Sequence, residues 1–389
     1  KDRELIKDLD SLPLPAYHLA EEYLPSRQKL KNKVAWVIVG RGCPYRCAFC
    51  CLGGVLPRMR SAESILGEIK LLKQRYGIRK FFFGHDHFLF RKDKAKQICD
   101  FFIDRKLSIE WKIFSRIDNI DIKLISKLSK AGCREILFGI ESGSSNIQRV
   151  IKKNLDLPSI AETIYKCTKY NILPHLSFIL GFTEEKPEDL NETMELAFGL
   201  SRFVKYNARF SLLTPWSGTP LLKKYRNDLI FTDKISQGIN QPTVNLKQNQ
   251  RLIKKYPLIF SGFYAIKPRY LPWETVYQLG SLFYNLLHNY PLSSSLAMKE
   301  LNLKPIELLE ILKRWMKRKN INWDGDFANF KRECLFNGKI NNVFPSFIED
   351  TYNDKKISFN FLKRILGLER ERYDFFFRIV NTPEVLSRL

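Results

Sequence analysis

Three cysteines near the start of the chain have the type and spacing of iron–sulfur ligands. Cys43, Cys47 and Cys50 follow one another at intervals of four and three residues. Thiolates this close in sequence can point into one volume when their loop wraps around a metal centre. Structural zinc takes four ligands, and a four-iron cluster usually takes one thiolate for each iron. Three cysteines would leave one iron of a [4Fe–4S] cluster open to chemistry, and structural zinc is the alternative.

The remaining cysteines are expected to play no part in such a site. Cys51 follows the third cysteine directly, and adjacent side chains on a tight loop rarely reach the same cluster. Cys99, Cys133 and Cys167 lie in or just after predicted helices and should be small buried hydrophobic residues, and Cys334 stands alone. Apart from the one cluster, the eight cysteines are irregularly spaced, which favours a reducing compartment and predicts a cytoplasmic protein.

The elements around the cysteines alternate between strand and helix. An apolar strand at 34–39 runs directly into the cysteine loop. Five more strands are predicted at 80–83, 109–114, 135–140, 174–180 and 208–213, and helices between them at 61–77, 93–106, 122–132, 158–170 and 187–203. Ser61 is suited to cap the first of these helices and Gly77 to end it. Six such units predict an α/β fold with a parallel sheet, an open partial (β/α)6 TIM barrel rather than a closed barrel of eight.

Polar residues follow nearly every predicted strand. In barrels of this kind the active site collects at the carboxyl ends of the strands, and the cysteine loop occupies that place after the first strand. The polar residues at the other strand ends are His85, Asp86 and His87 after the second, Ser115 and Arg116 after the third, Glu141 and Ser142 after the fourth, Glu184 and Glu185 after the fifth, and Ser217 and Thr219 after the sixth.

As a set, these segments resemble the radical S-adenosylmethionine (SAM) superfamily over about residues 33–225. The hallmark of that family is a Cys-x3-Cys-x2-Cys loop with an aromatic residue before the last cysteine, which here is Phe49. The resemblance implies that Cys43, Cys47 and Cys50 hold a [4Fe–4S] cluster whose open iron binds SAM. It also implies reductive cleavage of SAM to a 5′-deoxyadenosyl radical, which abstracts hydrogen from a substrate.

The resemblance implies SAM contacts as well. They are Gly84 and Asp86 for the amino group, Ser115 and Arg116 for ribose and carboxylate, Glu141 for the ribose, and the backbone from Ser177 to Leu180 along the adenine. A carboxylate can pair with the SAM ammonium, a guanidinium can bind its carboxylate in bidentate fashion, and a carboxylate can accept from ribose hydroxyls. For Arg116 and Glu141 the alternative is a structural ion pair. His85 departs from the family, where many relatives have an acidic residue.

His85 and His87 also suggest a metal site, because their spacing on a departing strand places both on one side. No third ligand is evident in the sequence. A substrate contact, a proton relay or simply a polar loop is therefore favoured over a metal site.

The N-terminal segment, residues 1–32, is expected to be an arm, either a flexible terminus or a connector. Its stretch from Leu9 to Tyr17 resembles the connector in radical SAM enzymes that carry an N-terminal cobalamin-binding domain, which would precede Lys1. With such a domain, cobalamin would be a further cofactor and methyl transfer the leading reaction. Without it, radical rearrangement, cyclisation or C–C bond formation is favoured. The resemblance further implies a small-molecule, lipid or peptide substrate and a flavodoxin- or ferredoxin-type reductant.

The net charge of +24 raises the question of an anionic partner such as RNA or a phospholipid surface. The basic residues are spread along the chain, which favours a solvated basic surface. A nucleic-acid partner is therefore disfavoured, and peripheral contact with an anionic membrane stays open. Two alternatives are carried forward: an RNA-modifying radical SAM enzyme, and a non-catalytic iron–sulfur or zinc protein that binds nucleic acid.

The pattern changes in the last third of the chain. We predict the partial barrel over 33–235 and a mostly helical C-terminal domain over 236–389. That domain should begin with a polar linker at 237–250, followed by apolar-periodic helices at 273–287, 293–300, 305–317, 357–365 and 373–380. The pair at 293–319 also suits a helix-turn-helix module, but its Leu, Ile and Trp content favours a cap on the open side of the barrel. No run of eighteen apolar residues occurs, so no transmembrane helix is predicted.

Overall fold

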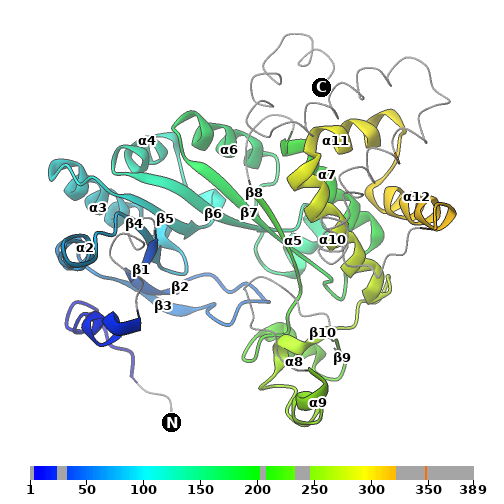
Figure 1. Ribbon diagram of the computed structural model, residues 1–389, viewed down its shortest axis with the longest axis horizontal. Helices are drawn as coiled ribbons and strands as arrows, with labels where there is room; N and C mark the ends of the chain where they lie inside the picture. Colours follow the sequence, from blue (N-terminus) through cyan, green and yellow to red (C-terminus); the bar gives the residue numbers. More distant parts are fainter. Residues whose placement is uncertain (1–3, 24–32, 202–206, 233–245, 321–346, 348–389) are drawn as a thin grey trace. The chain divides into compact units, whose positions relative to one another are not determined.

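The computed structural model of the chain describes residues 4–23, 33–201, 207–232, 246–320 and 347 (Figure 1). These residues belong to two compact units. The first is Lys1–Ile140 with Leu155–Leu176, and the second is Glu141–Asn154 with Ser177–Leu389. Both predicted domain boundaries, after residues 32 and 235, fall at positions outside the described residues and stay predictions.

A six-stranded sheet with the order β1-β4-β5-β6-β7-β8 organises the described residues. The strands are β1 (Val34–Ile38), β4 (Lys80–Gly84), β5 (Glu110–Ser115), β6 (Cys133–Glu141), β7 (Leu173–Leu180) and β8 (Asn207–Leu212). The pairs β1–β4, β4–β5 and β5–β6 are parallel. Within the described ranges β1 and β8 end the order and do not pair with each other. The predicted open (β/α)6 arrangement is confirmed.

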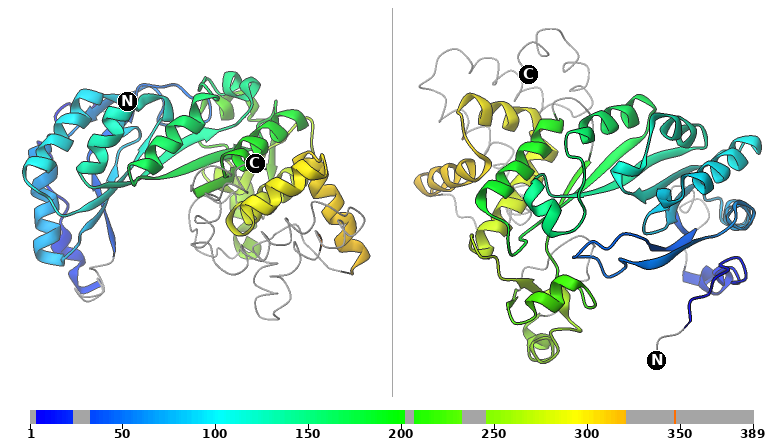
Figure 2. Two further views of the ribbon diagram at one scale, coloured as in Figure 1. Left: turned by 90° about the horizontal axis from the view of Figure 1, so that it is seen from above. Right: turned by 180° about the vertical axis from the view of Figure 1, so that it is seen from behind.

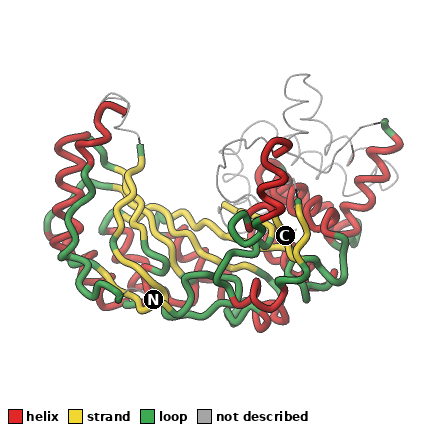
Figure 3. Tube along the Cα trace, turned by 90° about the horizontal axis from the view of Figure 1, so that it is seen from below, coloured by secondary structure: helices red, strands yellow, loops and turns green. Residues whose placement is uncertain are grey.

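Helices connect consecutive strands, as parallel pairing requires. They are α2 (Ala62–Tyr76), α3 (Lys92–Asp104), α4 (Ile122–Lys130), α5 (Ser145–Val150), α6 (Ser159–Lys169) and α7 (Pro187–Ser201). In α2 the predicted caps are present, because the Ser61 hydroxyl accepts from the Ser64 N–H at 3.1 Å and Gly77 adopts φ 71°. In the first unit α2, α3, α4 and α6 lie along one face of the sheet (Figures 2 and 3).

The core of the first unit lies between that helical layer and the sheet. Phe83 on β4 stacks on Trp111 of β5 at 4.8 Å, and Phe102 of α3 meets the same indole edge-on at 6.3 Å. The indole N–H donates to the carbonyl of Ala131 at 2.8 Å, so the buried Trp111 keeps its polar atom paired. Cys99, Cys133 and Cys167 are fully buried, as predicted.

The second unit contains the described part of the C-terminal third. Its elements are α8 (Pro220–Tyr225), β9 (Leu229–Phe231), α9 (Leu246–Lys255), β10 (Tyr264–Ile266), α10 (Trp273–Asn289), α11 (Pro291–Glu300) and α12 (Pro305–Arg318). Helix α10 packs on β8, while α11 and α12 pack on α7. The three predicted helices are confirmed, and α10 covers the edge strand β8. The predicted linker is wrong at 246–250, where a polar segment forms the start of α9.

Some predictions fall on other parts of the chain. The helices at 357–365 and 373–380 and the isolated Cys334 lie outside the described residues. Within the described residues, no helix is long and apolar enough to cross a membrane.

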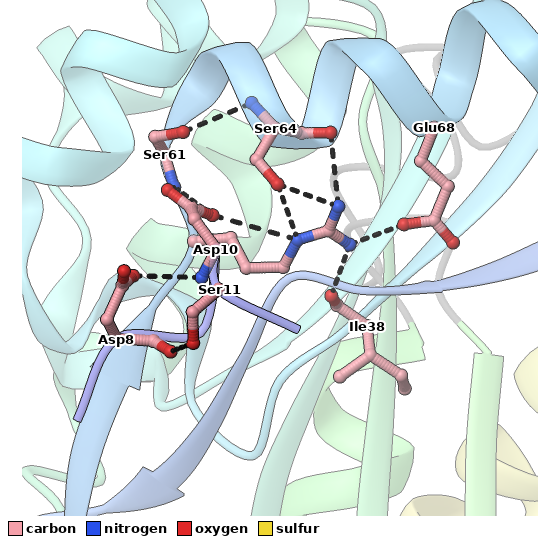
Figure 4. A network of polar contacts seen from close by, with 8 residues as sticks. Asp8, Asp10, Ser11, Ile38, Ser61, Ser64 and Glu68 are labelled. Atoms are coloured by element: carbon pink, nitrogen blue, oxygen red, sulfur yellow. Dashed lines mark hydrogen bonds and ion pairs between the residues drawn. The ribbon is translucent and has the colours of Figure 1, made fainter. Parts of the chain in front are cut away.

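The N-terminal arm docks on α2 in the first unit, so for residues 4–23 a flexible terminus is the wrong interpretation. The Asp10 carboxylate accepts from the Ser61 N–H at 3.0 and 3.1 Å (Figure 4). Further along the arm, the short 3-10 helix η1 (Tyr17–Tyr23) begins with Tyr17, whose hydroxyl donates to Glu68 of α2 at 2.5 Å. The arm thus contacts the helix that directly follows the cysteine hairpin.

Candidate cluster and SAM site

The predicted cysteine loop is carried by an antiparallel hairpin that the sequence did not reveal. Strand β2 (Gly40–Cys43) pairs with β3 (Val55–Met59) immediately after β1. Gly42 has φ +85°, and a Cβ there would lie 2.6 Å from the Leu56 carbonyl oxygen, so only glycine fits. The hairpin holds the first cysteine at the carboxyl end of β1, where Val39 donates its N–H to the Gly84 carbonyl at 3.1 Å.

Backbone hydrogen bonds close the loop between the two hairpin strands. The Gly54 N–H donates to the carbonyls of Cys43 at 3.0 Å and Tyr45 at 2.8 Å. The Cys50 N–H donates to the Cys47 carbonyl at 3.1 Å, which makes one turn between the second and third cysteines. These bonds fix the backbone of the loop independently of any bound group.

The three thiols lie on one loop and influence one another electrostatically. Cys43, Cys47 and Cys50 are free and half-buried, whereas Cys51 is exposed. Burial raises the pKa of the Cys50 thiol, and the neighbouring thiols of Cys51, Cys47 and Cys43 add to that rise. Burial also raises the pKa of Cys43. Such a set of soft sulfur donors suits iron, and metal binding would displace the thiol protons.

No three His, Cys, Asp or Glu side chains in the described ranges are grouped to hold one metal ion. Thiolates that bind a [4Fe–4S] cluster each attach to a different iron and therefore need not share one ion. A tetrahedral zinc site needs four donors around a single centre. The three thiols are thus compatible with a cluster.

Asp86 ties the end of β4 to the cysteine hairpin. Its Oδ2 accepts from the Gly42 N–H at 2.9 Å, and the residue is exposed. The charges of Asp86 and Arg116 both act on the Cys43 thiol. Gly84 precedes this turn, and a Cβ there would lie 2.7 Å from the Ile38 side chain. The predicted residues of β1, β4 and β5 in the first unit are therefore neighbours.

Arg116 forms the ion pair that the sequence left open as an alternative. Its guanidinium donates to Asp118 through Nε at 3.0 Å and Nη2 at 2.6 Å. The same group lies over the Tyr45 ring, 3.9 Å from its centroid. Asp118 and Tyr45 hold the buried guanidinium beside the cysteine loop, and a role towards SAM stays a prediction.

His87 and Ser115 belong to a buried network that anchors Tyr45 of the cysteine loop. The Tyr45 hydroxyl donates to Asn119 Oδ1 at 3.1 Å, and Asn119 Nδ2 lies 3.0 Å from His87 Nε2. Ser115 Oγ lies 3.2 Å from His87 Nδ1. The sequence did not indicate Tyr45 or Asn119, because their pairing joins the loop to the turn after β5 across 74 residues.

His85 lies in a different environment from His87. Its ring stacks on Phe90 at 5.1 Å, and its Nδ1 accepts from the His87 N–H at 2.9 Å. Burial lowers the pKa of His85 to about 4, with the Asp86 carboxylate opposing that shift. Its neutral ring also fills the space against Gly40, where a Cβ would overlap it. Among the described residues the two histidines share no third ligand.

Glu141 ends β6 in the second unit with a left-handed backbone. Its φ is +69°, which is uncommon for a residue that is not glycine and costs of order 1–2 kcal/mol. Its Oε1 accepts from Lys153 Nζ at 2.7 Å, and both side chains are buried. The ion-pair alternative is therefore present. A strained residue held this firmly at a strand end is typical of a functional position.

The Ser142-Gly143-Ser144 turn after Glu141 is fixed to α7. The Thr193 hydroxyl accepts from the Gly143 N–H at 2.9 Å and lies 2.9 Å from the Ser142 hydroxyl. The Ser144 hydroxyl donates to Asp189 at 2.5 Å. These bonds impose the backbone conformation from which Glu141 projects.

Gly143→Ala is expected to destabilise the protein by about 2–4 kcal/mol, because an inflexible backbone faces the new methyl group. A Cβ at this position would lie 2.7 Å from the Glu192 carbonyl oxygen and 2.8 Å from Thr193 Cα. Urea unfolding measures the change. Gly199→Ala in α7, where a Cβ meets nothing within 4 Å, is the control and should be neutral or stabilising. Equal stability of the two variants would contradict the close approach.

Comparison with protein-family models identifies the core of the chain. Residues 37–197 match the model of the radical SAM superfamily. They form a radical SAM domain. Domains of this kind use a [4Fe–4S] cluster and SAM, and the range includes all three cysteines and the predicted contacts.

Curated relatives share the radical SAM domain and extend beyond it. An uncharacterized methyltransferase of Pyrococcus horikoshii is 29% identical over 278 residues, which are 69% of this chain and 59% of the relative. The anaerobic magnesium-protoporphyrin IX monomethyl ester cyclase of Cereibacter sphaeroides is 26% identical over 278 residues, 69% of this chain and 45% of the relative. The chain thus spans about half the length of these relatives.

A solved structure shares the fold of the radical SAM domain and much of the rest. It is the cobalamin-dependent SAM radical enzyme OxsB with aqua-cobalamin and SAM bound, with a TM-score of 0.52 and 14% identity. The likeness covers 88% of this chain and 59% of that one. At this identity it shows the fold alone.

The remaining predicted residues of the radical SAM domain lie on the cysteine loop and on β7. Phe49 is half-buried in the cysteine loop, in the first unit. Ser177 is half-buried and Leu180 buried on β7, in the second unit. Their roles towards SAM stay predictions.

Glu185 follows β7 in the radical SAM domain as a buried carboxyl group. Its Oε2 accepts from the Gly181 N–H at 2.6 Å, at a glycine with φ +90°. Burial raises the pKa of Glu185 from 4.5 to about 8, although the backbone bonds from Gly181 and Phe182 oppose this. The folded protein therefore keeps this proton in a pH range where the unfolded chain has lost it.

Glu185→Gln is expected to stabilise the protein at pH 8 and to change little at pH 4. Because the folded state binds one proton more than the unfolded state between pH 4.5 and about 8, the wild type loses stability as pH rises through that window. The slope is at most about 1.4 kcal/mol per pH unit. Urea unfolding of both proteins at several pH values gives the difference. A difference independent of pH would contradict a buried protonated Glu185.

Proposed function

We propose that this chain is a radical SAM enzyme that reductively cleaves SAM and uses the resulting 5′-deoxyadenosyl radical to abstract hydrogen from a small-molecule substrate. The main support for this proposed function is the cysteine loop. Three half-buried thiols lie on a hydrogen-bonded loop after β1 of a radical SAM domain. A bound [4Fe–4S] cluster would supply the electron for SAM cleavage and an open iron for SAM.

The chain's own residues would bind and orient SAM. We assign the cluster to Cys43, Cys47 and Cys50, and the SAM ammonium to the exposed carboxylate of Asp86, which the Gly42 N–H already orients. Arg116 and Ser115 of the β5 end would serve the carboxylate and ribose. In the second unit, Glu141 has one oxygen on Lys153 and would offer the other to ribose hydroxyls.

We further propose methyl transfer, with ring formation as the alternative reaction. The support is the names of the relatives, which are methyltransferases and a cyclase. The fold likeness to a cobalamin-dependent enzyme supports cobalamin as an added cofactor. A flavodoxin- or ferredoxin-type protein is proposed as the electron donor. Peripheral contact with an anionic membrane rests only on the net charge of +24.

Anaerobic reconstitution with iron and sulfide, followed by electron paramagnetic resonance of the reduced protein, tests the proposal. We expect a [4Fe–4S]⁺ signal whose shape changes when SAM is added, and 5′-deoxyadenosine in the reaction mixture. A cluster whose signal ignores SAM, or a protein that retains only zinc, would leave a structural metal site and overturn the radical mechanism.

A further inference from the structure

The sheet of the first unit has a row of aromatic rings on the face away from its helices. We propose that this row, together with Lys112, binds a planar conjugated or aromatic group of the substrate that carries an anionic substituent. We call Trp36, Phe82 and Phe114 the aromatic strip. The identity of the ligand as substrate rests on the proposed function, whereas the binding chemistry does not.

Strand alternation places the strip on the uncovered face. Val37, Phe83 and Ile113 point towards the helices and are 0% exposed. Their neighbours point the other way, and there Trp36 is 57% and Phe114 37% exposed. Trp36 pairs with Phe82 in the β1–β4 register, so the two rings belong to one cross-strand row.

The three rings form one continuous apolar surface. The centroids of Trp36 and Phe82 are 4.2 Å apart, and those of Phe82 and Phe114 are 4.7 Å apart. Phe82 is only 5% exposed because its neighbours cover it. Large apolar side chains left in water next to one another usually mark a binding surface. Flat rings add stacking to the burial of area when a flat ligand covers them.

A charged group marks one border of the strip. In the β4–β5 register Lys112 pairs with Phe82, and its ammonium lies 5.3 Å from that ring. Lys112 forms an ion pair with Glu135 on β6 at 3.7 Å, and the same carboxylate lies closer, at 2.8 Å, to His175 Nε2. An ammonium has three donors, so Lys112 can bind an anionic group at the edge of the rings. The strip and Lys112 together fit a ring with a carboxylate or a similar anion.

The position of the strip suits a substrate. Phe114 directly precedes Ser115, and Trp36 lies three residues before Val39, about 10 Å along an extended strand. The strip therefore lies on β1, β4 and β5, the strands whose carboxyl ends lead into the cysteine hairpin and the predicted SAM residues Gly84 and Ser115. A ligand stacked there would have its ring near the place where the radical is expected.

Two fluorescent probes test the strip in the full chain: anionic 8-anilinonaphthalene-1-sulfonate and neutral N-phenyl-1-naphthylamine. We expect saturable binding of both by the wild type. Trp36→Ser should raise both dissociation constants about tenfold through loss of stacking and apolar contact. Tyr165→Ser on α6 is the control, because Tyr165 is also 57% exposed but lies on the helical side. It should bind both probes as the wild type does.

Lys112→Gln tests the charged part of the site. It should weaken the binding of the anionic probe several-fold and leave the binding of the neutral probe unchanged. Equal affinities of wild type and Trp36→Ser, or no probe binding by the wild type, would overturn the proposal; the latter would mean that the strip is covered by another part of the chain. An unchanged circular dichroism spectrum and an unchanged urea-unfolding midpoint in Trp36→Ser show that the variant is folded. The probe result therefore stands apart from the test of the radical mechanism.

Discussion

Replacing Cys43, Cys47 or Cys50 by alanine is expected to abolish the SAM-responsive [4Fe–4S] cluster, whereas Cys51→Ala should keep it. The first three thiols are half-buried on the closed loop, and Cys51 is exposed beside them. With three protein ligands a cluster has no thiolate to spare. Iron and sulfide content after anaerobic reconstitution, together with the paramagnetic signal, measures the outcome. We expect at least a tenfold loss of 5′-deoxyadenosine formation, about 1.4 kcal/mol or more in the barrier.

The four cysteine variants also control for one another. All four should unfold at similar temperatures without metal, because the loop is closed by backbone bonds at Gly54 rather than by the thiols. Cluster loss in Cys51→Ala with retention in Cys50→Ala would reassign the third ligand. Stoichiometric zinc in the wild type, lost equally in all four variants, would instead support the structural alternative.

The regular elements of the first unit could be predicted because their causes are local. Ser61 and Gly77 are side-chain and backbone caps that act within a few residues, and the structure has both. Alternating strand and helix patterns predicted the open parallel sheet, because right-handed crossovers leave few choices. The position of the three half-buried thiols on one loop was predictable for the same reason, because it follows from their spacing alone.

The contacts that shape the candidate site could not be predicted, because they join residues far apart in the chain. Asp86 binds the Gly42 N–H across 44 residues, and Tyr45 reaches Asn119 across 74. The β2–β3 hairpin was missed because short strands around glycines and cysteines carry no alternating apolar pattern. The positive φ of Glu141 follows from the hold of α7 on the next three residues, which no local pattern reveals.

The docking of the N-terminal arm also depends on residues far apart in the chain, and it affects the stability of the protein. Arg60 lies between the arm, α2 and β1, and its side chain is only 11% exposed. It donates to the Ile38 carbonyl at 3.0 Å and to the Ser64 hydroxyl at 2.9 Å, and it pairs with Glu68. Its backbone N–H donates to the carbonyl of Val39 at 2.9 Å, and Val39 is the residue before β2, the first strand of the cysteine hairpin. This single side chain therefore links three segments next to the candidate cluster site.

Arg60→Met is expected to cost about 3–5 kcal/mol of stability, because the Glu68 carboxylate, which is 1% exposed, loses its cation and the Tyr17 hydroxyl that still bonds it carries no charge. Arg75→Met is the matched control: it removes the ion pair of Arg75 with Glu21, whose side chains are 52% and 40% exposed, and should cost much less because water screens exposed ion pairs. Urea unfolding measures both. The double variant Arg60→Met with Glu68→Gln should recover part of the loss, since the buried charge is gone. Equal costs for the two single variants, or no recovery in the double variant, would mean that the network contributes only packing.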